Sequence, residues 1–495
     1  MDFAIEVPGE ANPLNQQNLQ RIIAQASSND QQQVKTGTQQ LTNWEKLPGF
    51  YSSLQSTFLN KSLPIEVRYL CAIQIKNGID KYWRKTATNA VSRNEKDLIR
   101  SRCIDAGIKE SDHRLLLQNA LVVAKIVRHD YPHDWPDAIG LVLTEIERAQ
   151  SDEELSRCLL ILLYIIKELA TGRLQRNRTN LQSAAPNIFR VVATKYIDHV
   201  SEWMDSLTSS ENMSESLMPK MQQSLCSIRI LRRLLVAGYQ HPNRDNDVAQ
   251  FWAIMTEKLQ QMLSWLVAQA SDFQSGAKSV VEKHVMQFSK LHLDMARSSP
   301  AGFTLLPGST DLARSYWALI RSFGQHLGLN SLEELSRISS QGDKADEVTI
   351  IEKISLKGLL ILRACAKMVF DPAHTFRFRH PQDKEEEKRS REIIRLNLFT
   401  DAFAHEIMET MVTKFFVFRP RDLREWQDEP DEWERREEGE GDVWEFSVRS
   451  CAEKLFLDVM INYKDLLVQP LLKVFGSVAS KLVRGCPNAH ANNQM

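Results

Sequence analysis

The stretch that most constrains the fold is Leu63–Trp83 (LPIEVRYLCAIQIKNGIDKYW), which predicts one amphipathic helix beginning at Pro64. The segment just upstream, residues 41–58, supplies a second short amphipathic run after the break at Pro48 and Gly49. The two runs predict a helix hairpin, and such a hairpin cannot bury its apolar face alone. The apolar residues of the longer helix recur at three- and four-residue spacings, and they are Val67, Leu70, Cys71, Ile75, Ile79 and Tyr82.

The rest of the chain repeats this pattern. Two successive runs occupy about 40–50 residues, which is the period of two-helix solenoid repeats. We therefore expect an all-α solenoid in which each helix pair buries its apolar face against its neighbours. The further runs, separated by Pro, Gly, Asn, Asp and Ser, are residues 94–106, 113–131, 138–148, 152–170, 184–203, 218–237, 248–269, 277–295, 311–327, 348–369, 392–416, 443–463 and 466–482.

The composition indicates a large buried core without a global charge. The 495 residues are 43% hydrophobic and 25% charged, and the formal net charge is -1. This balance gives no overall attraction to nucleic acid or to an anionic membrane. The most apolar stretch, residues 155–170, contains charged residues and is short for a membrane span, so it predicts a buried helix. The seven cysteines form no CxxC pair, and we expect buried free thiols.

Motifs of catalysis and cofactor binding are absent from the sequence. No GxGxxG, GxxxxGK[ST], GxSxG or HExxH occurs, so no catalytic residue and no cofactor is expected. His129 and His133 are the closest pair of histidines, but a structural metal site would need two more ligands nearby. We therefore expect a binding protein that is not an enzyme and holds no metal.

Two charged segments stand out. Residues 428–442 carry nine carboxylates together with Pro430 and two glycines, which predicts a flexible acidic loop. It is either a solvated spacer or a negative patch that attracts basic ligands. Residues 377–391 mix both signs and predict a loop leading into a helix near Glu392. The Phe-Arg-Phe-Arg start of that segment is a poor electrostatic footprint for nucleic acid, so no direct nucleic-acid partner is expected.

Three pieces in the first 150 residues carry a family resemblance. They are Trp44–Phe50 (WEKLPGF), Pro64–Trp83, and Leu115–Val127 with the Tyr-Pro and Trp-Pro pairs that follow it. In this order and spacing they resemble the N-terminal domain of the importin-beta (karyopherin-beta) superfamily of nuclear transport receptors. A fourth piece, residues 422–465, is similar to the importin-eleven type, with its Trp-acidic-Pro-Glu segment and its Trp-x-x-Ser-x-Arg-x-Cys helix.

The resemblance implies a right-handed superhelical solenoid of about 9–10 HEAT-type helix hairpins. It implies an importin N-terminal domain over residues 1–150 and a continuing HEAT array over 151–485, with the acidic loop at 426–442. Residues 486–495 form a polar tail without a capping repeat. Since family members are about twice this length, the chain is expected to be a truncated, N-terminal half.

The implied function is nuclear transport. The resemblance implies a receptor, an importin by subfamily, that binds protein cargo and Phe-Gly nucleoporins and is regulated by the small GTPase Ran in its GTP form. It also implies that the protein shuttles between nucleus and cytoplasm without inserting into a membrane. Candidate Ran contacts are Glu66, Tyr69, Ile73, Lys76, Asn77, Asp80 and Lys81. Candidate cargo or Ran contacts in the acidic loop are Trp426, Asp428, Glu429, Asp431, Glu432 and Trp433.

Structural alternatives accompany these assignments. Lys76 and Asn77 can instead cap or pair within the hairpin, and Arg68 can join neighbouring repeats by bonding carboxylates or carbonyls of the adjoining helix. The rival function is a helical-repeat scaffold without Ran-coupled release of cargo. Residue types alone do not fix whether Ran expels or clamps the cargo, because that is the sign of a coupling free energy between two sites.

Overall fold

The computed structural model describes residues 13–172, 175–208, 217–268, 276–329, 349–376, 381–416, 420–438 and 442–485. Every regular element within these ranges is a helix, and none of them contains a strand. The prediction of an all-α fold is confirmed. The chain divides into two compact units, unit 1 being Met1–Tyr239 and unit 2 being Gln240–Met495.

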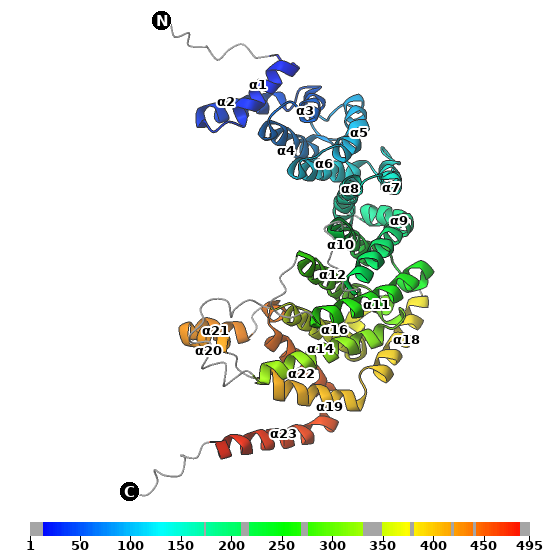
Figure 1. The fold of residues 1–495 in the computed structure, drawn as a ribbon, viewed down its shortest axis with the longest axis vertical. Helices are drawn as coiled ribbons and strands as arrows, with labels where there is room; N and C mark the ends of the chain where they lie inside the picture. The colour runs from blue at the N-terminus through cyan, green and yellow to red at the C-terminus, as the bar shows by residue number, and fades with distance from the viewer. Residues whose placement is uncertain are drawn as a thin grey trace. The chain divides into compact units, whose positions relative to one another are not determined.

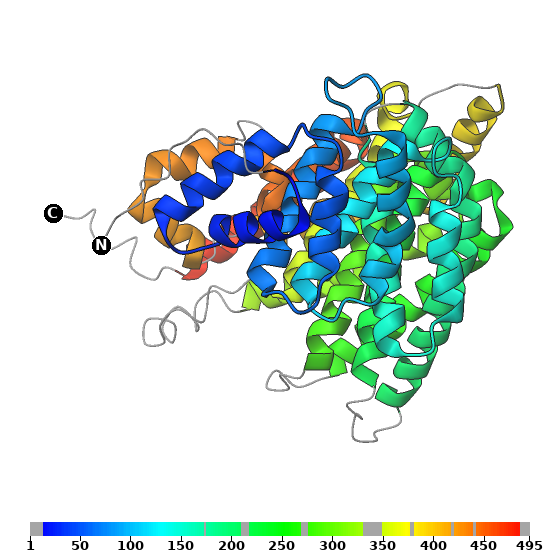
Figure 2. The same ribbon diagram turned by 90° about the horizontal axis from the view of Figure 1, so that it is seen from above.

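Unit 1 is a stack of helix pairs. Consecutive helices joined by short turns pack against each other, as α3 does on α4, α5 on α6 and α7 on α8. Figures 1 and 2 show these pairs lying side by side. The helices of unit 1 are α1 (Gln16–Ala26), α2 (Gln31–Trp44), α3 (Phe50–Leu59), α4 (Ile65–Tyr82), α5 (Arg93–Ile108), α6 (His113–Asp130), α7 (Ala138–Arg148), α8 (Asp152–Ala170), α9 (Gln175–Thr208), α10 (Leu217–Arg233) and the π-helical turn η1 (Leu234–Gly238).

Side-chain caps explain where several of these helices begin. Ser92, Asp112 and Ser151 precede α5, α6 and α8, and each side chain accepts hydrogen bonds from backbone N–H groups of the first turn. Such bonds satisfy donors that have no partner inside the helix. Pro64 occupies the cap position before α4, so the helix begins at Ile65, one residue later than the sequence predicted.

The second helices of the pairs form a continuous row in unit 1. Helix α4 packs on α6, α6 on α8, and α8 on α10. We call α4, α6, α8 and α10 the second-helix row of unit 1. Helix α8, the most apolar stretch of the sequence, is buried within this stack, as predicted. Among the described residues, no helix combines the length and the apolar character needed to cross a membrane.

Unit 2 continues with helix pairs and has its own row, in which α12 packs on α16 and α16 packs on α22. We call these three helices the second-helix row of unit 2. The elements are η2 (Pro242–Arg244), α11 (Asn246–Ala268), α12 (Gly276–Ser298), α13 (Pro300–Leu305), α14 (Ser309–Leu329), α16 (Ile350–Phe370), α17 (Pro372–Thr375), α18 (Pro381–Asn397), α19 (Asp401–Thr410), η4 (Met411–Phe415), α20 (Pro420–Asp428), α21 (Pro430–Glu438), η5 (Asp442–Phe446), α22 (Val448–Asn462) and α23 (Lys464–Gly485).

Several sequence-based boundaries were wrong. The run predicted over 392–416 is two helices, because Thr400 caps a new helix by accepting a hydrogen bond from the N–H of Phe403. Helix α18 already begins at Pro381, so most of the segment predicted as a loop is helical. Residues 377–380 lie outside the described ranges. Helices α1 and α2 were missed because their sequences are rich in glutamine.

The acidic loop is also corrected. Most of residues 426–438 belong to two short helices, α20 and α21, which pack on each other. Figure 1 shows this pair to one side of the helix stack of unit 2. Pro430 is the first residue of α21, and Asp431 and Glu432 lie in its first turn. Negative charge at this end stabilises the helix through its dipole. The expected self-repulsion did not prevent helix formation.

The prediction of free thiols holds for the described cysteines. Five of them are buried and Cys226 is half-buried, and none forms a disulfide. Burial raises the pKa of the Cys103 thiol to about 12, so this group stays protonated at neutral pH. Cys486 lies outside the described residues.

Candidate functional site

Helix α4 is held in unit 1 by its apolar side. Val67, Cys71, Ile75 and Ile79 are each at most 5% exposed. Gly78 lies against the ring of Tyr51, and a Cβ there would meet the Tyr51 ring at 2.0 Å. Glycine at this position therefore lets α3 approach α4 closely and fixes which face of α4 remains outside.

Arg68 joins neighbouring repeats, as predicted. Its Nε donates to the carbonyl of Phe58 at 2.8 Å, and its guanidinium pairs with the carboxylate of Glu110. Both side chains are almost fully buried, at 7% and 3% exposure. Glu110 also accepts a hydrogen bond from the N–H of Asp112 at 3.0 Å. The role of Arg68 is thus structural, because a buried charge-assisted pair cannot reach a partner protein.

The seven candidate Ran contacts all lie on α4, away from its buried side. Their positions follow the three- and four-residue spacing of a helix face. Four are exposed and three are half-buried. The exposed residues are Glu66, Asn77, Asp80 and Lys81, and the half-buried residues are Tyr69, Ile73 and Lys76.

The next helix of the row contributes to the same face. Lys76 Nζ donates to Gln118 Oε1 at 3.0 Å, and Gln118 Nε2 donates to the hydroxyl of Tyr69 at 3.2 Å. Lys125 Nζ lies 2.6 Å from Asp80 Oδ1. We define the α4–α6 face as the seven candidate residues on α4 together with Gln118 and Lys125. Sequence reasoning missed these last two residues, although both are polar positions within the apolar run of the helix.

Polar pairs continue on either side of this face. Glu45 accepts hydrogen bonds from Lys81 at 3.1 Å and from the Tyr82 hydroxyl at 2.9 Å. Burial, together with Glu45, raises the pKa of Tyr82, so its hydroxyl remains a donor. Arg128 on α6 pairs with Glu168 on α8 at 2.5 Å. The α4–α6 face is therefore part of a longer row of polar contacts between adjacent second helices.

The second set of candidates lies on α20 and α21. Trp426 is 49% exposed, and the side chains of Asp428, Glu429, Asp431 and Glu432 are exposed. Their carboxylates form a negative surface that can attract basic ligands.

Trp433 differs from the other residues of this set. It is half-buried, and its ring packs on the guanidinium of Arg449 at 5.3 Å. Trp426 therefore offers an exposed ring, whereas Trp433 anchors α21 to α22.

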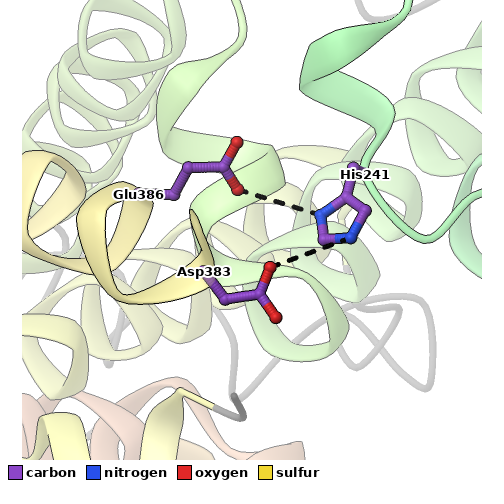
Figure 3. A group of neighbouring side chains, drawn as sticks. All are labelled: His241, Asp383 and Glu386. Atoms are coloured by element: carbon purple, nitrogen blue, oxygen red, sulfur yellow. Dashed lines mark ion pairs between the residues drawn. The ribbon is translucent and has the colours of Figure 1, made fainter. Parts of the chain in front are cut away.

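A third cluster lies between η2 and α18 in unit 2 (Figure 3). Nε2 of His241 is 3.9 Å from Asp383, and Nδ1 of His241 is 3.8 Å from Glu386. Three residues of this kind can in principle hold a metal ion. No sequence motif predicted the cluster, because 142 positions separate His241 from Asp383.

The partners of this cluster indicate an ion-pair site and not a metal site. Arg244 donates to Glu386 at 2.8 Å and to Asp383 at 3.4 Å. The two carboxylates also face different nitrogens of one imidazole, and a metal ion binds through only one of them. Burial alone would raise the pKa of Glu386, but Arg244, Asn243 and His241 outweigh it and lower that pKa. The cluster ties α18 to η2.

Comparisons with known proteins agree with the fold and the N-terminal motifs. Residues 37–109 match the family model of the Importin-beta N-terminal domain. The chain is 32% identical to the importin beta-like protein KAP120 of Saccharomyces cerevisiae, over 95% of this chain and 44% of the relative. It is 28% identical to importin-11 of Homo sapiens, over 92% of this chain and 43% of the relative. The chain thus spans less than half the length of these relatives.

A solved structure supports the helical-repeat architecture. The structure of Lph2, described as a bidirectional nuclear transport receptor in S. cerevisiae, superposes with a TM-score of 0.76 and 27% identity. The match covers 93% of this chain and 42% of that one. The resemblance inferred from the sequence pieces is confirmed.

Proposed function

Since this chain carries an importin-beta N-terminal domain and is similar along most of its length to importin-beta-like proteins, we propose that it acts as a nuclear transport receptor. Such a receptor binds its partners and performs no chemistry on them, so we propose no enzymatic activity. It shuttles between nucleus and cytoplasm through the nuclear pore.

The observation that carries the proposal is the α4–α6 face. Most of it lies in the matched domain, on a helix whose opposite side is locked in the core. Its polar groups are held in place by contacts between adjacent helices, so little conformational entropy is lost when a partner binds. We propose that Ran in its GTP form contacts this face.

The remaining partners follow from the same proposal. Protein cargo binds along the second-helix rows. Phe-Gly nucleoporins bind between the first helices of neighbouring pairs. The acidic surface of α20 and α21 is a further contact for basic cargo or for Ran. We propose residues 1–150 as the Ran-binding domain and 151–485 as the continuing array. Similarity to importin-11 favours import as the direction of transport.

The test is the affinity of the full chain for Ran loaded with a non-hydrolysable GTP analogue or with GDP, measured by biolayer interferometry. We expect at least about tenfold tighter binding of the GTP form, in the range of typical coupling between two sites. Equal affinity for both forms, or no binding, would instead support the rival function, a helical-repeat scaffold.

A pair of variants locates the binding surface. Lys76→Ala combined with Asp80→Ala removes two charges from the α4–α6 face. Asp105→Asn combined with Lys109→Gln removes an exposed ion pair at the end of α5, which is the first helix of its pair. The first variant should weaken Ran binding by about tenfold or more, whereas the second should leave it unchanged. Equal effects of both variants would remove the α4–α6 face from the proposal.

A further inference from the structure

The second-helix row of unit 2 carries an excess of positive charge. We define the basic strip as Lys290 and Arg297 on α12, Lys357 and Arg363 on α16, and Arg449 on α22. Burial raises the pKa of the Cys451 thiol, and three cations of the strip oppose this shift. They are Arg297, Lys357 and Arg363, which therefore lie near the same thiol. Within the described part of the chain, the carboxylates of Asp294, Glu445 and Asp458 lie near residues of this strip.

A segment of the chain itself covers this strip. The turn η5 follows the acidic helices and packs on α16 and α22. The ring of Trp444 lies 4.2 Å from the guanidinium of Arg363. Glu445 accepts two hydrogen bonds from Arg297, at 2.8 and 3.2 Å. An aromatic ring and a carboxylate that are adjacent in sequence therefore dock on two cations from different helices.

The covering segment leaves positive charge unsatisfied. Burial lowers the pKa of Lys357, and the charges of Arg297 and Lys290 lower it further. Nε of Arg363 donates to Asp458 at 2.6 Å, but its buried Nη1 has no hydrogen-bond partner within the described part of the chain. A buried guanidinium donor without an acceptor is costly, and a ligand carboxylate would satisfy it.

The contacts of the covering segment are weak enough to be exchanged. Arg297 is 42% exposed and Glu445 is 27% exposed, and ion pairs of this kind contribute little to stability. The segment can therefore leave when a stronger ligand of the same chemistry arrives.

We propose that the basic strip is a binding site for an acidic, aromatic-containing peptide segment of a protein partner, and that the chain's own Trp444-Glu445 segment occupies it as an intramolecular competitor. A ligand with more carboxylates reaches Lys290 and Lys357 as well as the two arginines, so it binds more tightly than the internal segment once that segment is displaced. This inference rests on the proposed receptor function and names one class of partner.

The probe is a fluorescein-labelled peptide with blocked ends and the sequence EEGEGDVWEF, which corresponds to residues 437–446. Its affinity is measured by fluorescence anisotropy for the full chain and for an open variant, Trp444→Ala with Glu445→Ala. Removal of an intramolecular competitor should lower the Kd of the peptide by about tenfold or more. Circular dichroism of the open variant verifies that the helices are intact.

Matched controls test the strip and the chemistry of the ligand. In the open variant, Arg297→Gln with Arg363→Gln should abolish the increase in peptide affinity. Lys388→Gln with Arg389→Gln, which changes two exposed cations on α18, should preserve that increase. A peptide with Ala in place of Trp and Gln in place of the last Glu should bind more weakly. Equal affinity for the open variant and the unmodified chain would overturn the proposal.

Two other outcomes would also contradict it. Equal loss of binding from the strip variant and the α18 variant would indicate non-specific charge attraction. Tighter binding of a single-stranded RNA than of the peptide would assign the strip to a different class of ligand. The Ran measurement concerns residues of unit 1, so a failure here leaves the GTP preference intact and separates the two proposals.

Discussion

The second-helix rows of the two units present their polar groups in different ways. In unit 1, side chains of α4 and α6 pair with each other and remain at the surface, as Asp80 does with Lys125. In unit 2, the cations of α12 and α16 are covered by a later segment through Trp444 and Glu445. We propose that the first row is a preformed binding surface and that the second becomes accessible only when an internal competitor is displaced.

The same comparison separates interactions that hold the stack from those that can bind partners. Arg68 and Glu110 are buried between helices of unit 1 and satisfy each other. Asp80 and Lys125 form an ion pair on the α4–α6 face, where Asp80 is 56% exposed. Burial decides between the two roles, because removing one partner of a buried pair leaves an uncompensated charge.

The largest expected effect sharpens this separation. Arg68→Ala leaves the carboxylate of Glu110 buried without its partner and should lower the free energy of unfolding of unit 1 by about 3–5 kcal/mol. Urea denaturation of the full chain, followed by hydrogen exchange of peptides from unit 1, measures the change. A loss below about 1 kcal/mol would contradict the structural role of Arg68.

Lowering the pH should destabilise the core of unit 2. His292 is 1% exposed, and burial lowers its pKa to about 3. The unfolded chain binds a proton at this residue below pH about 6.5, whereas the folded chain does not, so stability falls as the pH falls from 6.5 towards 3. By pH 4.5 the loss is about 2–3 kcal/mol.

A variant isolates this contribution. His292→Asn removes the titrating ring, whose Nδ1 lies 3.0 Å from the Tyr316 hydroxyl, and should flatten the pH dependence even if it lowers stability at pH 7. Urea midpoints at pH 7 and pH 4.5 provide the comparison, with hydrogen exchange assigning the change to unit 2. An unchanged difference between the two midpoints would show that His292 is not the responsible group.

A smaller effect is expected at the end of α4. The indole N–H of Trp83 donates to Asp130 at 2.9 Å, and Arg100 donates to the same oxygen at 2.6 Å. Trp83→Phe removes one donor but leaves the other, so unit 1 should lose about 1–2 kcal/mol of stability. Thermal unfolding measures this loss, which should be smaller than that of Arg68→Ala. The reverse order would show that Trp83 stabilises the second-helix row of unit 1 more than Arg68 does.

The smallest effect on stability is predicted for the α4–α6 face. Asp80→Asn removes an exposed ion pair with Lys125 and should change the free energy of unfolding by less than about 0.5 kcal/mol. The same variant should weaken binding of GTP-loaded Ran several-fold. Urea denaturation and interferometry measure the two quantities. A large loss of stability without a loss of affinity would show that this face stabilises the helix stack and does not bind Ran.

The fold was largely predictable because apolar spacing and helix-breaking residues are local signals. Helices α7 and α8 have the predicted bounds, since each is flanked by clear breaks and has a strong apolar side. Helices α1 and α2 were missed, because their buried side chains are few among many glutamines. The segment 426–438 was predicted as a loop from its charge, whereas Pro430 and the docking of Trp433 on Arg449 favour helices.

The candidate sites were less predictable, because they depend on contacts between distant residues. The structural role of Arg68 was inferred from the sequence as an alternative, because an arginine can bond carboxylates or carbonyls of the adjoining helix. Gln118 and Lys125 were missed, since nothing in α4 indicates which residues of α6 lie beside it. The basic strip gathers residues from three helices that are far apart in the sequence, so no sequence window contains its excess of charge.

Site-specific photo-cross-linking tests the central claim most directly. A photoreactive amino acid is placed at exposed Asn77 on α4 and, in a second sample, at exposed Asp105 on α5. The account predicts a cross-link from position 77 to GTP-loaded Ran, little or none to GDP-loaded Ran, and none from position 105. Cross-links from position 105 alone, or binding of GTP-loaded Ran without any cross-link from position 77, would contradict it.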